Sequence, residues 1–433
     1  MKFSVVTLGC KVNQYETQAM ERELCARGHE QVDISSPCDC LIVNTCTVTA
    51  VADKKGRSLI RRLRREHPDA VLGVCGCYSQ LHPESVRELG ADVVSGSGGR
   101  QAFLDLLLQT CEDRVRRVQL DEALRRRDFE RLPAGGLSER TRAMLKVQDG
   151  CSSFCSYCII PYSRGPVRSL PLSEAVAEAR RLREAGYREI VLTGIEIASW
   201  GKDLRDERGL VRLVAAVCRA VPEVRVRLGS LEPRCVDEAF CRELSGLSNL
   251  CPQFHLSLQS GSDTVLARMR RRYDTARYLE SVELLRRFFP GCAITTDLIV
   301  AFPGETEEEF RQSLDFLRVC GFAHVHVFPY SRRPGTPAAR MDGQHGNAVK
   351  RARSEQAVQT AAELSLRFYE QLRGTEQQVL FETAEDGYWS GHAMNSVRVY
   401  VRGEIHNNEL WRVRVTEPFR DGVLGELLKE EHR

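Results

Sequence analysis

The sequence lacks the features that would place a protein in a membrane or outside the cell. Its 433 residues contain no apolar run that approaches the roughly 18 residues of a membrane-spanning helix. The N-terminal residues MKFSVVTLGCK lack the long apolar segment and the cleavage site of a secretory signal peptide. The formal net charge is only +3, so any contact with nucleic acid must come from local basic patches. These absences predict a cytoplasmic protein with no membrane partner.

Cysteine, by contrast, is abundant. The chain has 17 cysteines, and in a reducing compartment this large, odd number indicates metal or redox chemistry rather than a disulfide framework. The length is sufficient for three domains of ~150 residues each.

Residues 1–100 alternate short apolar strands with helical patterns, which is typical of a doubly wound parallel α/β sheet. Such sheets bind ligands at the carboxyl ends of their strands. The first three predicted strands each end in a cysteine, and we expect Cys10, Cys46 and Cys77 to converge at one edge. Cys75 is an alternative to Cys77, because it lies two residues earlier on the same predicted strand and would point to the same face.

The rest of the chain shows three further patterns. Residues 104–140 are rich in arginine and predict an irregular connector that ends in the glycine-rich loop LPAGGLSER. Residues 143–340 contain six strand–helix units, which predict a partial parallel (βα)6 barrel with its chemistry at the carboxyl ends of the strands. Residues 345–372 predict one long helix, and alternating strands from residue 374 predict a small β-barrel. We therefore predict three domains, at residues 1–130, 137–368 and 370–433.

The loop after the first barrel strand, DGCSSFCSYCIIPYSRGPVRS at residues 149–169, carries cysteines at the spacing C-x3-C-x2-C. A structural zinc site needs four ligands, and no fourth cysteine or histidine follows Cys151, Cys155 and Cys158 closely. Three thiolates on an iron–sulfur cluster would leave one iron open to a substrate. The alternatives are three packing thiols, or a zinc site completed from elsewhere in the chain.

The spacing, with Tyr157 before the last cysteine, resembles the signature of the radical S-adenosylmethionine superfamily. More specifically, eight segments resemble the methylthiotransferase family of those enzymes, over nearly the whole chain. The segments are TLGCKVNQYE, NTCTVT, CGCYSQ, CSSFCSYCIIPYSRGPVRS, RLGSLEP, HLSLQSG, DLIVAFPGETEEEF and FPYSRRPGTPA.

The resemblance implies two [4Fe–4S] clusters and S-adenosyl-L-methionine as cofactors. Cys151, Cys155 and Cys158 would hold the radical cluster, and Cys10, Cys46 and Cys77 would hold a second cluster that delivers sulfur. The family motif favours Cys77 over Cys75. The resemblance also implies an electron donor such as flavodoxin or ferredoxin and a C-terminal TRAM domain that binds RNA, while the sulfur donor stays open.

Five polar or small residues at the ends of predicted barrel strands, together with Tyr157, are candidate contacts for S-adenosylmethionine. Each is equally compatible with an ordinary turn or a satisfied polar group of the barrel, and no residue is assigned a catalytic role. The five residues are Gly194, Glu196, Ser230, Gln259 and Asp297.

The segments GCKVNQYE and IIPYSRGPVRS look most like the branch that acts on threonylcarbamoyladenosine beside the tRNA anticodon. The predicted function is therefore conversion of that nucleoside to its 2-methylthio derivative. The alternatives are methylthiolation of isopentenyladenosine or of a ribosomal-protein aspartate, and a noncatalytic zinc-binding RNA adaptor. Arg332 and Arg333 follow the last barrel strand, where a guanidinium could clamp the threonyl carboxylate or, equally, hold tRNA phosphates.

Basic segments for RNA lie at Arg57–Arg65, Arg114–Arg127 and Arg268–Arg272, and each could equally be a solvated face. Residues 374–433 carry eleven acidic and seven basic side chains, which is unlike a strongly basic RNA-binding domain. RNA binding by this region would therefore depend on a few arginines, namely Arg398, Arg402, Arg412 and Arg414.

Overall fold

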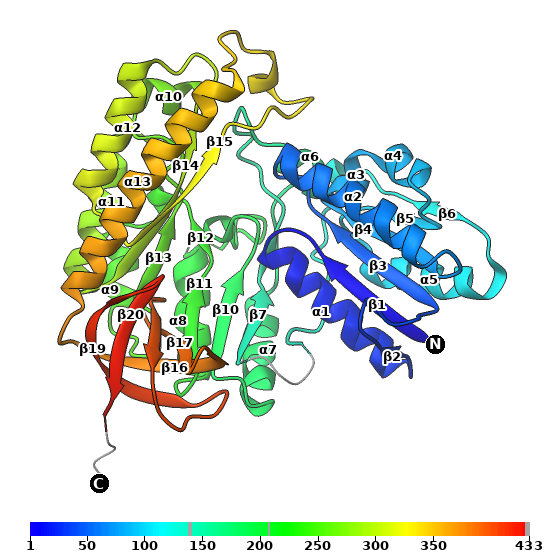
Figure 1. Ribbon diagram of the computed structural model, residues 1–433, viewed down its shortest axis with the longest axis horizontal. Helices are drawn as coiled ribbons and strands as arrows, with labels where there is room; N and C mark the ends of the chain where they lie inside the picture. Colours follow the sequence, from blue (N-terminus) through cyan, green and yellow to red (C-terminus); the bar gives the residue numbers. More distant parts are fainter. Residues whose placement is uncertain (137–140, 207, 429–433) are drawn as a thin grey trace.

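The computed structural model describes residues 1–136, 141–206 and 208–428. The chain forms a parallel-sheet domain, a partial parallel barrel and a small closed β-barrel (Figure 1). The predicted fold class is therefore confirmed. Within the described ranges, no helix is long and apolar enough to cross a membrane.

The N-terminal domain is one parallel sheet with strand order β2-β1-β3-β4-β5-β6. Its two central strands, β3 and β4, are buried along their whole length, as expected for an apolar run covered by helices on both faces. The strands are β1 (Lys2–Thr7), β2 (Glu30–Gln31), β3 (Cys40–Thr45), β4 (Val71–Gly76), β5 (Val93–Ser95) and β6 (Arg117–Gln119). The helices are α1 (Lys11–Ala26), α2 (Ala50–Glu66), α3 (Cys77–Leu81), α4 (Pro83–Glu88) and α5 (Arg100–Asp113).

The irregular connector predicted at residues 104–140 is wrong in its first part. Helix α5 continues to Asp113, and strand β6 and a short 3₁₀ helix, η1 (Ala123–Arg125), follow it. The helix forms because Phe103, Leu104 and Leu107 are spaced so that they fall on one face of a helix, and this apolar face is buried against the sheet. The end of the predicted glycine-rich loop, residues 137–140, lies outside the described residues.

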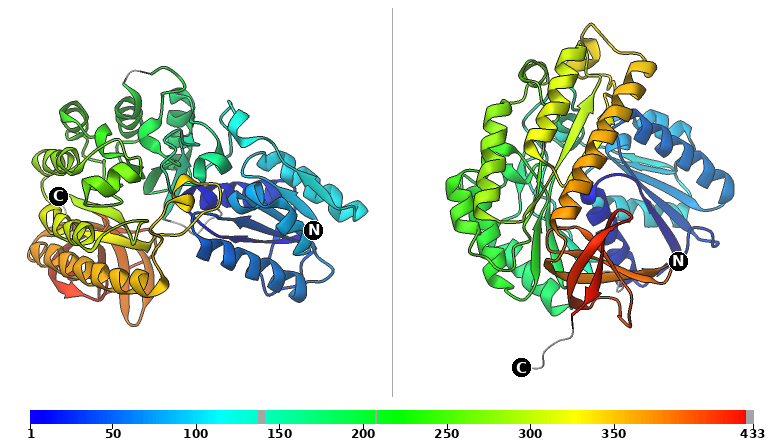
Figure 2. Two further views of the ribbon diagram at one scale, coloured as in Figure 1. Left: turned by 90° about the horizontal axis from the view of Figure 1, so that it is seen from above. Right: turned by 60° about the vertical axis from the view of Figure 1, so that its left-hand side comes forward.

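The barrel strands run in parallel in two hydrogen-bonded groups, β11-β10-β7 and β12-β13-β14-β15. Strand β11 pairs with β10, and β12, which follows Gly229, pairs with β13. Helices cover the outer face (Figure 2). The strands are β7 (Arg142–Lys146), β10 (Glu189–Thr193), β11 (Arg225–Leu228), β12 (Ser230–Leu231), β13 (Gln253–Leu256), β14 (Ala293–Val300) and β15 (His324–Pro329), with a small ribbon of β8 (Gln148–Asp149) and β9 (Arg168–Ser169). The α-helices are α6 (Ile160–Arg164), α7 (Leu172–Glu184), α8 (Gly209–Ala220), α9 (Glu238–Leu244), α10 (Asp263–Arg268), α11 (Thr275–Phe288) and α12 (Glu307–Cys320).

The closed C-terminal barrel, with order β16-β17-β18-β20-β19, lies at the amino ends of the large barrel's strands (Figure 1). Arg225 donates to the His392 carbonyl at 3.1 Å, and Arg227 donates to the Met394 carbonyl at 3.0 Å. The C-terminal barrel thus closes the end of the large barrel opposite the cysteine loop. The elements are α13 (Asn347–Gln371), β16 (Glu376–Glu385), β17 (Tyr388–Ala393), β18 (Arg398–Val401), β19 (Leu410–Phe419) and β20 (Gly422–Leu427).

Candidate functional site

The three cysteines of the barrel lie in the loop between β8 and α6, at the carboxyl ends of the barrel strands. The loop is folded on itself, because the Cys158 amide donates to the Cys155 carbonyl at 3.0 Å. Burial raises the pKa of the Cys158 thiol to about 12, and the neighbouring Cys155 contributes to the increase. A coordinated metal reverses this effect, because a thiol that binds a metal is deprotonated.

Arg271 is the cation closest to this triad. Its Nη1 donates to the Cys155 Sγ at 3.3 Å, and its Nε donates to the Tyr273 hydroxyl at 3.0 Å. Tyr157 stands beside the loop and packs edge-on against Phe302, with ring centroids 6.5 Å apart. The loop therefore has an apolar support on one side and a hydrogen-bond donor for a thiolate on the other.

The second triad lies at the carboxyl edge of the N-terminal sheet. Cys10 caps α1 after strand β1, Cys46 follows β3, and Cys77 begins α3 after β4. A Cβ atom at Gly9 would lie 3.0 Å from the Cys46 Sγ, so glycine permits this close approach of the first two loops. Burial raises the pKa of Cys46 to about 12, and the nearby Cys77 and Cys10 thiols add to the increase.

Cys75 does not belong to this triad. Gly76 has a φ of 105°, in the region that favours glycine, and it turns the chain into α3 before Cys77. The strand alternation therefore stops at Gly76, and Cys75 remains fully buried in the apolar cluster with Met20 and Phe103. The expectation that Cys75 and Cys77 point to the same face was wrong for this reason.

Arg164 connects the two cysteine sets. It ends α6, just after the barrel loop, and its Nε donates to the Cys77 Sγ of the other domain at 3.1 Å. The same guanidinium donates to the Asn13 side chain at 2.9 Å and pairs with Glu16. It is fully buried, so the N-terminal triad borders a buried charged group contributed by the barrel.

The buried ion pairs at this boundary join four cations to two carboxylates, which leaves an excess of positive charge. The cations are Arg100, Lys146, Arg164 and Arg168, and the carboxylates are Glu16 and Asp149. The excess suits a site that holds negatively charged thiolates, because buried charges require compensation. The residues present therefore fit an anionic cluster bound at Cys10, Cys46 and Cys77.

Three other potential metal ligands lie together inside the barrel. The ligand atoms of His255, Asp297 and His326 all lie within 4.8 Å of one another.

Loss of Arg164 is expected to weaken the boundary between the domains. Arg164→Met should lower the free energy of unfolding by about 3–5 kcal/mol, because it leaves the buried Glu16 with one cation fewer. Urea denaturation of the apoprotein measures this as a lower midpoint. Arg62→Met is the matched control, since Arg62 is half exposed in a surface pair, and it should change stability by less than about 0.5 kcal/mol. Equal midpoints for the two variants would contradict the role of Arg164.

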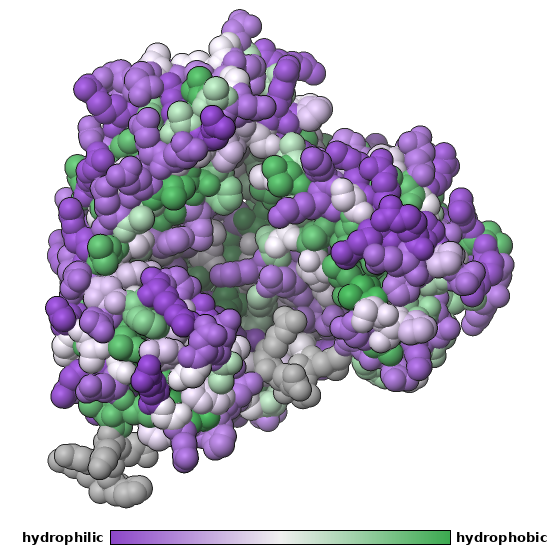
Figure 3. Space-filling model, in the orientation of Figure 1, coloured by the Kyte–Doolittle hydropathy of each residue, from purple (hydrophilic) through white to green (hydrophobic). Residues whose placement is uncertain are grey.

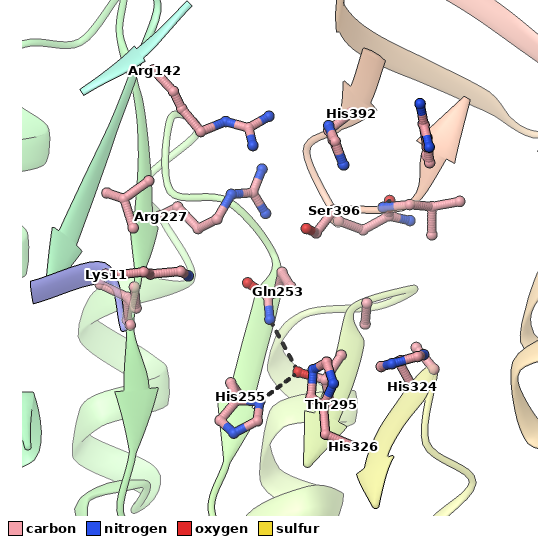
Figure 4. Close-up of a pocket in the computed structure, with 18 of the residues that line it drawn as sticks. Lys11, Arg142, Arg227, Gln253, His255, Thr295, His324, His326, His392 and Ser396 are labelled. Atoms are coloured by element: carbon pink, nitrogen blue, oxygen red, sulfur yellow. Dashed lines mark hydrogen bonds between the residues drawn. The ribbon is translucent and has the colours of Figure 1, made fainter. Parts of the chain in front are cut away.

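A cavity of about 750 Å³ occupies the inside of the barrel and opens toward the N-terminal domain. Figure 3 shows this face of the molecule hollowed between the two domains. Strands β13, β14 and β15 supply His255, Asp297 and His326, while Lys11 enters from the N-terminal domain (Figure 4). The His255 Nδ1 is hydrogen bonded to the Thr295 hydroxyl at 3.0 Å, and its Nε2 lies 3.3 Å from Asp297.

The candidate contacts for S-adenosylmethionine divide into three groups. Ser230 and Asp297 line the cavity. Gly194 and Glu196 lie against Gln148. The Glu196 amide donates to the Gln148 side chain at 2.8 Å. Burial raises the pKa of the Glu196 carboxyl group. Gln259 has a φ of 70° and bridges to β14 through its backbone, with its amide 2.9 Å from the Asp297 carbonyl.

The two arginines after the last barrel strand have different surroundings. Arg333 is buried, and its Nη2 donates to Asp53 at 2.6 Å and to Thr47 at 2.7 Å, so its charge is already compensated within the protein. Arg333 is therefore not free to bind a substrate carboxylate, as the sequence analysis expected it could. Arg332 is exposed, and its Nε donates to the Ala339 carbonyl at 2.8 Å.

The arginines of the C-terminal barrel are also paired. Arg412 and Arg414 both contact Glu376, Arg398 contacts Asp421, and Arg402 donates to the Tyr388 hydroxyl at 2.9 Å. These pairs reduce the positive charge that the surface presents to RNA phosphates.

Sequence reasoning missed Arg164, Arg271 and Lys11. The sequence offered only a weak indication of each arginine: Arg164 follows the cysteine loop closely, and Arg271 belongs to the basic segment Arg268–Arg272. Nothing in their local sequence shows that they donate to a sulfur atom, because both contacts join distant segments.

Two family models match the chain. The radical SAM superfamily matches residues 145–317, and the uncharacterized protein family UPF0004 matches residues 2–96. The threonylcarbamoyladenosine tRNA methylthiotransferase MtaB of Bacillus subtilis strain 168 is 36% identical over 98% of this chain and 96% of its own length. The tRNA-2-methylthio-N(6)-dimethylallyladenosine synthase of Pelotomaculum thermopropionicum is 31% identical over 89% of this chain and 87% of its own length.

Among solved structures, the radical S-adenosylmethionine methyltransferase TsrM from Kitasatospora setae, with cobalamin and a [4Fe–4S] cluster bound, has a similar fold. The TM-score is 0.56 at 16% identity, over 90% of this chain and 80% of that one. This likeness shows a shared fold, and the near-complete match to the curated relatives identifies the family. The chain belongs to the methylthiotransferase family of radical S-adenosylmethionine enzymes.

Proposed function

We propose that the protein converts N6-threonylcarbamoyladenosine beside the tRNA anticodon to its 2-methylthio derivative. The observation that carries this proposal is that each of two packed domains carries a cysteine triad, and that Arg164, which follows the barrel loop, donates to Cys77 of the other domain. The Bacillus subtilis relative, which has that activity in its name, aligns with 98% of the chain and so supports the choice of substrate.

As a member of its family, the protein uses S-adenosylmethionine and [4Fe–4S] clusters. We assign Cys151, Cys155 and Cys158 to the radical cluster and Cys10, Cys46 and Cys77 to the sulfur-delivering cluster. Gly194, Glu196, Ser230, Gln259 and Asp297 are proposed to surround S-adenosylmethionine. We place the corresponding domains at residues 1–130, 137–368 and 370–433.

When bound, these groups supply the one-electron chemistry that replaces an unactivated C–H hydrogen by sulfur and a methyl group. The protein contributes position and electrostatics. Arg271 and Arg164 donate hydrogen bonds to the Cys155 and Cys77 sulfurs, which stabilises the thiolate forms. The cavity provides polar groups that orient the substrate nucleoside.

Two partners follow from this chemistry. The substrate is a tRNA, and the basic segments Arg57–Arg65, Arg114–Arg127 and Arg268–Arg272 are candidate contacts for its phosphates. A reductant such as flavodoxin or ferredoxin supplies electrons, because cleavage of S-adenosylmethionine to a radical consumes one. We place the protein in the cytoplasm, where tRNA is modified.

Deletion of the gene is expected to remove 2-methylthio-N6-threonylcarbamoyladenosine from cellular tRNA and to leave its unthiolated precursor. Nucleoside mass spectrometry measures both, and the gene carried on a plasmid should restore the modified form. A Cys155→Ala copy should not restore it, because the proposed radical cluster loses a ligand. Loss of 2-methylthio-isopentenyladenosine instead would show that the substrate is the one acted on by the Pelotomaculum relative.

A further inference from the structure

One cation of the cavity inside the barrel, Lys11, is not part of an ion pair within the described ranges. The arginines that line the cavity each contact a carboxylate, since Arg142 and Arg227 share Glu189 and Arg398 contacts Asp421. The Lys11 ammonium forms no hydrogen bond or ion pair with any residue in the described ranges. Figure 4 shows the Lys11 side chain extended into the cavity, below Arg227 and toward Gln253. A lysine in that position is ready to bind an anion.

The opposite wall of the cavity is polar. Gln253 donates to the Thr295 hydroxyl at 3.3 Å, and that hydroxyl also contacts His255 at 3.0 Å. His326 and Asp297 extend this surface on the neighbouring strands. The cavity therefore offers a charge together with several hydrogen-bonding groups, rather than an apolar pocket for a hydrocarbon.

We infer that Lys11 binds the carboxylate of the threonylcarbamoyl group and thereby selects the substrate, an inference that rests on the proposed function. Lys11 directly follows Cys10, so its ammonium belongs to the same loop as a proposed ligand of the sulfur-delivering cluster. Carbon 2 and the exocyclic nitrogen N6 both lie on the Watson–Crick edge of adenine. When carbon 2 faces the sulfur donor, the N6 substituent therefore extends along the same side as Lys11.

The energetics favour this selection. A buried carboxylate without a partner is costly, and a charge-assisted hydrogen bond is about twice as strong as a neutral one. An isopentenyl group would form neither the charge-assisted hydrogen bond with the ammonium nor hydrogen bonds with the polar wall. A site built from hydrogen-bonding groups rejects an analogue that lacks the matching groups far more strongly than an apolar site does.

The test uses reconstituted full-length enzyme and tRNA anticodon stem-loops with two nucleosides. One carries the threonylcarbamoyl group, and the other carries the same group with a neutral carboxamide in place of the carboxylate. K11Q should lower kcat/KM for the acid by about 10- to 100-fold and change that for the amide by less than about threefold. K11R should retain much of the preference for the acid, because it keeps the charge.

Two measurements separate this role from damage to the neighbouring cluster. Iron and sulfide content, and cleavage of S-adenosylmethionine without RNA, should be the same for K11Q as for the unaltered enzyme. Arg332→Gln tests the competing assignment, because it removes the exposed cation after the last barrel strand.

Equal loss on the acid and the amide with K11Q, or an acid-specific loss with Arg332→Gln alone, would overturn the assignment of Lys11. Failure of the unaltered enzyme to methylthiolate the acid would instead overturn the proposed function.

Discussion

Replacement of Cys151, Cys155 and Cys158 together by alanine is expected to abolish cleavage of S-adenosylmethionine and to leave about half of the iron. After anaerobic reconstitution, two four-iron clusters correspond to about eight irons per chain, so the variant should retain about four. The expectation follows from the positions of the triads, since each belongs to a different domain and the N-terminal set does not need the barrel loop for its thiols.

The measurement combines iron and sulfide analysis with detection of 5′-deoxyadenosine after reduction. The control replaces three cysteines that are buried in the barrel core, Cys218, Cys241 and Cys320, by serine or alanine one at a time. Each of these should keep about eight irons, because the side chains pack and do not bind metal. Full iron in the triple variant would contradict the ligand assignment, and zinc in place of iron in the unaltered protein would favour the adaptor alternative.

The order of strands and helices was largely predictable from the sequence, because apolar runs and glycine-rich turns recur at regular spacing along both α/β domains. Helix α12 is a clear example. Thr306 and Glu309 form a reciprocal capping box at its start, and three glutamates occupy its first turn. The exception was α5, whose apolar face is followed closely by arginines that suggested an irregular segment.

The cysteine triads could be expected from the sequence. The N-terminal thiols follow three parallel strands, whose carboxyl ends meet at one edge, and the barrel thiols share one short loop after the first barrel strand. The charged groups around the triads could not be expected. Arg164 reaches Cys77 from 87 positions away, and Arg333 reaches Asp53 from 280 positions away. Such contacts depend on how the two domains pack, and an arginine in a local sequence has the same appearance whether it is exposed or buried.

The role of Lys11 illustrates the same limit. In the sequence it is simply a lysine within GCKVNQYE, one residue from a cysteine. Only the placement of α1 at the open side of the barrel brings its ammonium into a cavity lined by residues of β11, β13 and β14. Substrate selection was therefore assigned to Arg332 and Arg333 on the basis of the barrel face alone, whereas the structure presents a cation from the other domain.

Cys46→Ala is expected to separate the two halves of the reaction. The variant should still cleave S-adenosylmethionine, because the barrel triad, Arg271 and the loop that holds them come entirely from the barrel. It should not form the methylthio product, because Cys46 is buried between the loops of Cys10 and Cys77 and its loss removes one of three ligands. Methylthiolation should fall below detection, while 5′-deoxyadenosine should persist within about threefold of the unaltered enzyme.

The matched control is Cys75→Ala, at a fully buried cysteine of the same domain that packs in the apolar core. It should keep both activities, because its thiol contacts hydrophobic residues rather than the other cysteines at the sheet edge. A stability loss in this variant is measured separately, by denaturation of the apoprotein. If Cys46→Ala lost cleavage of S-adenosylmethionine as completely as Cys155→Ala, the two sets would act as one site. The buried contact of Arg164 with Cys77 would then be the first connection to examine, since it is the direct hydrogen bond from the barrel to the second triad within the described chain.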